Sequence, residues 1–137
     1  MILLDTHVLV WSLQDDPALG PEARGFLDQQ AFADGYMVSA ITPWEIAMLT
    51  KKSRIILGAD VRRWIEEALA LPGMILAELE PAIAIDSVAL PGDFHNDPAD
   101  RIIIATARHH NIPLLTADRA ILDYAALGHV NAIDARH

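Results

Sequence analysis

Short apolar segments alternate with segments of helical pattern along the whole chain. Strands are expected at the short, mainly apolar segments of residues 2–4, 36–41 and 114–115. The segments between them carry apolar residues at helical spacing. This alternation is typical of a parallel sheet with helices packed on both faces. The sequence therefore predicts an α/β fold, a three-layer αβα sandwich whose central, mostly parallel sheet has four or five strands.

The ends of the remaining elements follow from helix caps, prolines and glycines. Two further strands are expected at residues 74–79 and, as the last edge strand, at 129–133. We see no internal repeat and no linker, so the 137 residues are expected to form one domain, residues 1–137. The expected helices span residues 8–13, 21–30, 42–52, 60–70, 81–89, 97–110 and 116–124.

The composition indicates a folded, cytoplasmic protein. Hydrophobic residues make up 53% of the chain, which is enough to form a core. There is no cysteine, so neither a disulfide nor a thiolate metal site can form. The apolar start, Met1 to Leu4, lacks a basic region and ends at Asp5, unlike a signal peptide. No apolar run approaches the ~20 residues of a membrane span.

Four acidic residues stand where apolar segments or cap-type residues lead into expected helices. They are Asp5, Glu45, Asp100 and Asp118. Open α/β folds gather functional groups at the carboxyl ends of their strands, so these acids are expected to meet there. A group of carboxylates repels itself unless a cation lies among them. Because oxygen ligands suit Mg²⁺ and Mn²⁺, the pattern predicts a divalent metal site.

Helix capping is an alternative explanation for most of these acids. Thr42 and Glu45 match a capping box. Asp97 is expected to cap the next-to-last helix and Thr116 the last one, where the helix dipole favours Asp118. The two explanations are compatible, because a carboxylate in a first helical turn is held in place and kept ionised, as a metal ligand must be.

The histidines and tryptophans suggest no second site. The spacing of His7, His95, His109 and His110 matches no standard metal-ligand pattern, so these residues are expected at the surface or on the rim of the acidic site. The three tryptophans are expected to be core or interface anchors. Neither a nucleotide-binding motif nor a serine-hydrolase motif is present.

Four segments resemble the signature segments of the PIN-domain family, and within it the VapC-type toxins of bacterial toxin–antitoxin pairs. The segment DPADRIIIATA is the most specific, and the opening LLDTH is the next. Together the four segments span nearly the full length in the order of the family. They are LLDTH (residues 3–7), WEI (44–46), HNDPADRIIIATA (95–107) and LLTADR (114–119).

The resemblance implies a metal-dependent endoribonuclease that hydrolyses RNA phosphodiester bonds with Mg²⁺ or Mn²⁺. Asp5, Glu45, Asp100 and Asp118 correspond to the acidic residues of the family's site and are the implied catalytic residues. Asp5, Asp100 and Asp118 are the implied metal ligands. A VapB-like antitoxin and a second copy of the chain are the implied protein partners, and RNA is the implied substrate.

Four neighbouring residues are given supporting functions by the same resemblance. Thr6 and Thr116 lie beside the site and are expected to bind a carboxylate or a metal-bound water. Asp97 is expected to be a supporting residue or a helix cap. For Arg101, an ion pair inside the protein and a contact with RNA remain open.

The net charge of −9 argues against broad electrostatic binding of nucleic acid. Lys51, Lys52 and Arg54 nevertheless form a basic group, and they are the expected RNA contacts. Arg62 and Arg63 form a second group. Ordinary surface charge at a solvated helix end explains these residues equally well.

Two alternatives to the ribonuclease remain open from the sequence. One is a catalytically degenerate PIN fold that only binds RNA or protein. The other is a magnesium-dependent phosphotransfer domain, although the motif around Asp5 lacks a second acid and the carboxyl-terminal half contains no lysine.

Overall fold

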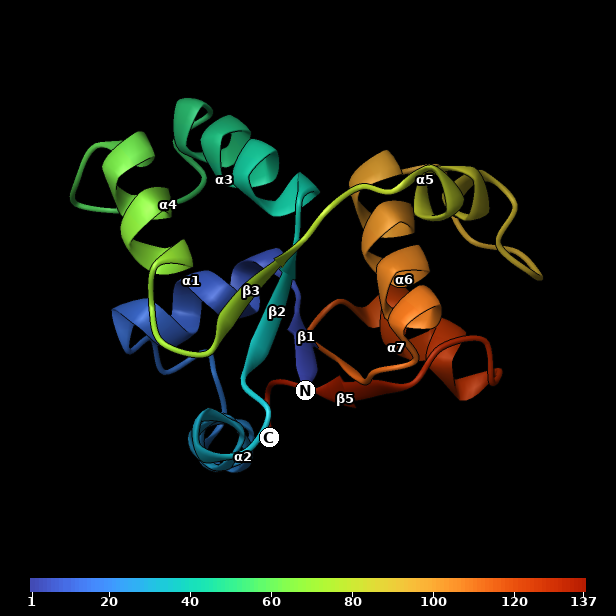
Figure 1. Cartoon of the computed structure of the whole chain (residues 1–137), viewed down its shortest axis with the longest axis horizontal. Helices are drawn as coiled ribbons and strands as arrows, with labels where there is room; N and C mark the ends of the chain where they lie inside the picture. Colours follow the sequence, from blue (N-terminus) through green and yellow to red (C-terminus); the bar gives the residue numbers. More distant parts are fainter.

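The computed structural model describes the whole chain except the side chains of residues 31 and 32. Five strands form one parallel sheet in the order β3-β2-β1-β4-β5 (Figure 1). The strands are β1 (Ile2–Leu4), β2 (Tyr36–Ser39), β3 (Met74–Ala77), β4 (Leu114–Thr116) and β5 (Ala132–Asp134). The helices are α1 (Thr6–Gln14), α2 (Pro21–Phe32), α3 (Ile41–Lys51), α4 (Val61–Leu69), α5 (Pro81–Val88), α6 (Pro98–His110) and α7 (Arg119–Ala126).

Helices cover both faces of the sheet, α1 to α4 on one side and α5 to α7 on the other (Figure 1). Side chains of a strand point alternately to the two faces. In β1, Leu3 packs into the core under α5 to α7, whereas Ile2 and Leu4 pack into the core under α1 to α4. The predicted three-layer sandwich is confirmed, and the sheet is wholly parallel.

Several predicted boundaries differ from the structure by two or three residues; the expected strand at 74–79, for example, ends at Ala77. Two of the differences have a clear physical reason. The apolar run at residues 36–41 predicts one strand, but β2 ends at Ser39 and α3 begins at Ile41. An apolar run alone does not distinguish a buried strand from the start of a buried helix. The last strand covers residues 132–134 rather than 129–133. Its pairing with β4 begins only where the N–H of Leu114 donates to the carbonyl of Asn131, at 2.9 Å.

The carboxyl ends of neighbouring parallel strands share one edge of the sheet, which is where open α/β folds place their sites. Leu4 lies beside Leu115, so the residues that follow β1 lie next to the end of β4. In the part of the chain that is described, no helix has both the length and the apolar character needed to cross a membrane.

Candidate metal centre

Asp5 is anchored through both of its carboxylate oxygens. It follows β1 and caps α1: Oδ1 accepts a hydrogen bond from the main-chain N–H of Thr6 at 2.8 Å. Oδ2 accepts from the hydroxyl of Thr116 at 2.6 Å. Only 7% of Asp5 is exposed, so its carboxylate is fixed between β1 and β4.

Asp118 is held by the same threonine. Its Oδ1 caps α7 by accepting from the main-chain N–H of Ile121 at 3.1 Å. Its own N–H donates to the Thr116 hydroxyl at 3.0 Å. The prediction that Thr116 caps α7 is therefore wrong. The cap is Asp118, and Thr116, which is fully buried at the end of β4, joins Asp118 to Asp5.

Asp97 and Asp100 begin α6 as the sequence predicts. Oδ1 of Asp97 accepts from the N–H groups of Ala99 at 2.9 Å and Asp100 at 3.2 Å, with Pro98 in the first turn. Asp97 is thus the helix cap. The Asp100 side chain is 15% exposed and lines the pocket described below.

The predicted capping box of Thr42 and Glu45 is wrong, because α3 begins one residue before Thr42. The N-cap is Ala40, which makes no side-chain cap bond. The Thr42 hydroxyl instead lies 3.1 Å from the hydroxyl of Thr6, which also bonds to Oε1 of Glu45. These hydroxyls hold Glu45 at the carboxyl end of β1.

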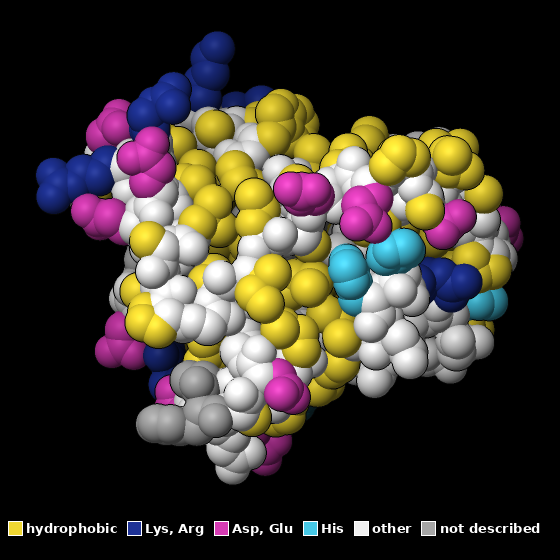
Figure 2. All heavy atoms as spheres, viewed as in Figure 1, with side chains coloured by type: hydrophobic (Ala, Val, Ile, Leu, Met, Phe, Trp, Pro, Cys, Tyr) yellow, Lys and Arg dark blue, Asp and Glu magenta, His cyan; other side chains and the backbone are white. Residues whose placement is uncertain are grey.

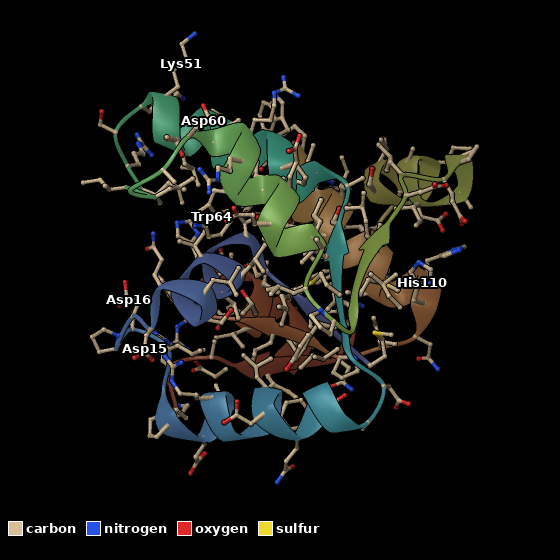
Figure 3. The ribbon with its side chains drawn as sticks, turned by 60° about the vertical axis from the view of Figure 1, so that its left-hand side comes forward. Asp15, Asp16, Lys51, Asp60, Trp64 and His110 are labelled. Atoms are coloured by element: carbon tan, nitrogen blue, oxygen red, sulfur yellow. The ribbon has the colours of Figure 1, made fainter. Side chains whose placement is uncertain are left out.

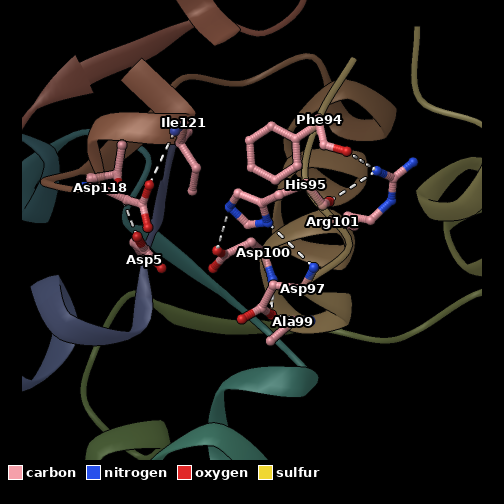
Figure 4. A network of polar contacts seen from close by, with 10 residues as sticks. Asp5, Phe94, His95, Asp97, Ala99, Asp100, Arg101, Asp118 and Ile121 are labelled. Atoms are coloured by element: carbon pink, nitrogen blue, oxygen red, sulfur yellow. Dashed lines mark hydrogen bonds and ion pairs between the residues drawn. The ribbon is translucent and has the colours of Figure 1, made fainter. Parts of the chain in front are cut away.

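One pocket of about 400 Å³ contains all four acids that the sequence singled out. Figure 4 shows Asp5 and Asp118 facing Asp97 and Asp100 across it. The carboxylates come from four separate segments, and the residues that line the pocket include no lysine or arginine. They are Asp5, His7, Trp11, Glu45, Asp97, Asp100, Ala117 and Asp118.

Burial and neighbouring negative charge raise the pKa values of three of these acids. Burial is the largest cause for Asp5, Glu45 and Asp100. The pKa of Asp100 rises to about 8, first through burial and then through the charges of Asp97, Asp5, Asp118 and Glu45. The expectation that a helix start keeps its acid ionised is therefore wrong for Asp100 in the protein alone. With a pKa of about 8, Asp100 needs positive charge beside it to stay ionised at neutral pH.

His95 contacts Asp100, which the spacing of the histidines did not reveal. Its Nε2 lies 3.4 Å from Oδ2 of Asp100. One potential ligand atom from each of His95, Asp100 and Asp118 lies within 4.8 Å of the other two. The residue is partly exposed at the rim, as expected. The one feature of the sequence that could have indicated this contact is that His95 lies two residues before Asp97, the cap of α6.

The other histidines and tryptophans lie in different places, and Trp64 packs against the core as predicted. His7 and Trp11 line the pocket, with ring centres 6.0 Å apart, so Trp11 is not only a core or interface anchor. His109 and His110 lie at the far end of α6, outside the pocket. Trp44 is 56% exposed and therefore not a core residue.

Arg101 holds the chain that precedes α6. Its guanidinium donates to the main-chain carbonyl oxygens of Ser87 and Phe94 at 2.8 Å, of His95 at 3.1 Å and of Val88 at 3.2 Å. The sequence left an ion pair and an RNA contact open for this residue. The structure gives its donors to backbone carbonyls instead.

Lys51, Lys52 and Arg54 lie outside the pocket. All three are exposed at the end of α3, and Lys51 points into solvent (Figure 3). Lysine and arginine side chains gather, among acidic ones, at one corner of the molecule (Figure 2). Along the helix axis Lys51 is about 9 Å from Glu45. None of the three residues lines the pocket.

The donor set fits a hard divalent cation. The pocket offers oxygen atoms from several carboxylates, and their raised pKa values show that their charge is poorly compensated by the protein. Oxygen ligands of this kind suit Mg²⁺ and Mn²⁺, whereas zinc and copper favour sulfur and nitrogen.

Known proteins share this fold. A family model described as the PIN domain matches residues 2–127. Ribonuclease VapC22 of Mycobacterium tuberculosis (strain ATCC 25618 / H37Rv) is 36% identical over 126 residues, which cover 88% of each chain. Two solved structures give the comparison in three dimensions. VapBC2 from Rickettsia felis, bound to a promoter DNA fragment, has a TM-score of 0.69 at 15% identity and covers 97% of this chain and 98% of that chain. FitAcB from Neisseria gonorrhoeae has a TM-score of 0.63 at 25% identity and covers 100% and 99%.

The parallel sheet with an acidic pocket at its carboxyl edge defines the class of protein. The chain belongs to the PIN-domain family.

Proposed function

We propose that this chain is a metal-dependent endoribonuclease and the toxin of a VapBC-type toxin–antitoxin pair. One observation carries the proposal: Asp5, Glu45, Asp100 and Asp118 converge on a single pocket at the carboxyl edge of the sheet. The relative named Ribonuclease VapC22 supports RNA as the substrate. The proposed reaction is hydrolysis of an RNA phosphodiester bond.

Asp5, Asp100 and Asp118 are the proposed ligands of Mg²⁺ or Mn²⁺. When bound, such an ion supplies positive charge to the scissile phosphate and lowers the pKa of nearby water. Thr116 keeps Asp5 and Asp118 at a fixed separation through its two hydrogen bonds. Little reorganisation of these carboxylates is then needed when a cation and a phosphate enter.

Glu45 is the proposed acid–base group. The Thr6 hydroxyl holds its Oε1, and burial raises its pKa. A carboxyl group with a raised pKa exchanges protons with water closer to neutral pH than an ordinary one, which suits a general base. Asp97 supports the site by capping α6, and thereby fixes the turn that carries Asp100.

RNA binding is proposed to depend on local charge, because the chain as a whole carries a net charge of −9. Lys51, Lys52 and Arg54 are exposed and are the proposed contacts for phosphates outside the pocket. A phosphate enters the acidic pocket favourably only together with a cation. Binding of the scissile phosphate should therefore require the metal.

A VapB-like antitoxin is the proposed protein partner. A basic side chain of such a partner is complementary to the acidic pocket and would occupy the place of the cation. We also propose that the chain forms a homodimer and acts in the cytoplasm. Light scattering that shows only monomers, with and without the antitoxin, would contradict the dimer.

Cleavage of a pool of RNA transcripts tests the proposed reaction. The parent protein should cut RNA with Mg²⁺ and stop when a chelator is added. Asp100→Asn should cut RNA more than about 100-fold more slowly than the parent. This loss is larger than the loss of about 10–100-fold that is usual when a residue that only supports a metal ligand is changed. Asp123→Asn, an exposed acid on α7, is the matched control and should cut like the parent. RNA binding without metal-dependent cleavage would favour the binding-module alternative.

A further inference from the structure

Both the main chain and the side chain of His95 are held in place by neighbouring residues. The guanidinium of Arg101 donates to the carbonyl oxygens of Phe94 at 2.8 Å and His95 at 3.1 Å. The Phe94 ring packs against the imidazole of His95, with ring centres 4.1 Å apart, and against Tyr124 at 5.2 Å. His95 therefore presents its ring to Asp100 in a defined orientation (Figure 4).

The hydrogen bonds of His95 define which ring nitrogen carries the proton. Nδ1 accepts from the main-chain N–H of Asp97 at 3.3 Å, so it is the unprotonated nitrogen. The neutral ring then carries its proton on Nε2. That nitrogen lies 3.4 Å from Oδ2 of Asp100, within the range of an ion pair but longer than an ordinary hydrogen bond.

This arrangement is the reverse of that around a metal-binding histidine. A ligating histidine donates its second ring N–H to a carboxylate or carbonyl and presents a bare nitrogen to the ion. In His95 the nitrogen nearest Asp100, Nε2, bears the hydrogen, and the second nitrogen accepts from Asp97. His95 lies close to Asp100 and Asp118, but this closeness alone does not make it a metal ligand.

We infer that His95 is a positioning residue for Asp100, whose Oδ2 it holds through Nε2–H so that Oδ1 is presented to the cation. The inference rests on the proposed metal site. Arg101 contributes by fixing the main chain of His95, and Asp97 by fixing the orientation of its ring. Loss of a hydrogen bond of this kind behind a ligand lowers metal affinity by about 10–100-fold.

Calorimetric titration of Mn²⁺ into the parent protein, His95→Gln and His95→Asn tests this inference. Glutamine places an amide N–H near the position of Nε2 and keeps the donor to Asp100. Asparagine places its oxygen near Nδ1 and keeps only the acceptor for Asp97. We expect affinity close to that of the parent for glutamine, and affinity about 10–100-fold lower for asparagine.

The controls separate positioning from folding. His110→Gln changes an exposed histidine at the other end of α6 and should bind Mn²⁺ like the parent. All variants should melt at the same temperature in chelator. Equal affinity of the parent and His95→Asn would overturn the inference. Equal weakening of the glutamine and asparagine variants would also overturn it, because the donor would then not be what matters.

Electron spin echo spectra of bound Mn²⁺ give a second readout. A directly bound imidazole couples its nitrogen to the ion, and we expect no such coupling in the parent. A nitrogen coupling that disappears in His95→Gln would make His95 a ligand and overturn the inference while leaving the proposed metal site intact. If the parent binds no Mn²⁺ at all, the proposed metal site fails, and the inference fails with it.

Discussion

The hydroxyl of Thr116 donates a hydrogen bond to Oδ2 of Asp5 across 2.6 Å, although 111 positions separate the two residues in the chain. The same hydroxyl accepts from the N–H of Asp118. One buried side chain of β4 thus fixes two proposed metal ligands. The pairing of β1 with β4 brings them together, so the pocket depends on the register of the sheet.

Thr116→Val should weaken both the fold and the metal site. It leaves Oδ2 of Asp5 and the N–H of Asp118 without a partner, which should lower the free energy of unfolding by about 1–3 kcal/mol. Mn²⁺ affinity should fall by about 10–100-fold. Urea denaturation in chelator and calorimetry measure the two effects. Thr106→Val is the matched control, because this buried hydroxyl donates only within α6. Parent-like Mn²⁺ binding by Thr116→Val would contradict the prediction.

Without metal, the protein should lose stability as the pH rises towards 8. Asp100 has an ordinary pKa of 3.8 when unfolded and a pKa of about 8 when folded. Between these values the folded state binds more protons than the unfolded state, so the free energy of unfolding falls with rising pH. Thermal melts in chelator, from about pH 5.5 to about pH 8, should show this slope. Asp100→Asn should flatten it, and a slope as steep in the variant as in the parent would speak against Asp100 as its source.

The basic group at the end of α3 should affect RNA binding more than the chemical step. Replacing Lys51 and Lys52 with alanine should raise KM and leave kcat nearly unchanged, because these residues lie outside the pocket. A plot of the logarithm of the RNA-binding constant against the logarithm of the salt concentration should become less steep, by up to about 2 in slope. Arg136→Ala, an exposed arginine next to Asp134, is the control for loss of positive charge. An unchanged salt dependence would place the RNA contacts elsewhere.

Arg101→Lys should destabilise the segment before α6 even though the charge is kept. A lysine ammonium cannot reproduce the planar guanidinium that reaches four carbonyl oxygens. We expect the free energy of unfolding to fall by about 1–3 kcal/mol, together with weaker Mn²⁺ binding. Denaturation and calorimetry measure both. Arg63→Lys, on the exposed face of α4, should change neither. Normal metal binding in Arg101→Lys would separate this residue from the site.

Local signals explain why most of the fold could be predicted. Pro21 and Pro98 stand in the first turns of α2 and α6, and Asp97 caps α6 as its spacing indicates. The start of α3 was missed for a physical reason. Thr42 and Glu45 have the spacing of a capping box, and only the packing of α3 beside Thr6 shows that both serve the pocket instead.

The sequence by itself determined the alternation of strands and helices, the family segments and the acids near the starts of helices. These are properties of short stretches of chain, where apolar spacing and cap residues act locally. Only the tertiary structure decided that Thr116 joins Asp5 to Asp118, that Arg101 holds a backbone segment and that His95 faces Asp100. Most of these contacts join segments that meet only once the core has packed, and that of His95 with Asp100 depends on the orientation that packing gives the ring. The pattern along the chain does not state which side chains will face one another.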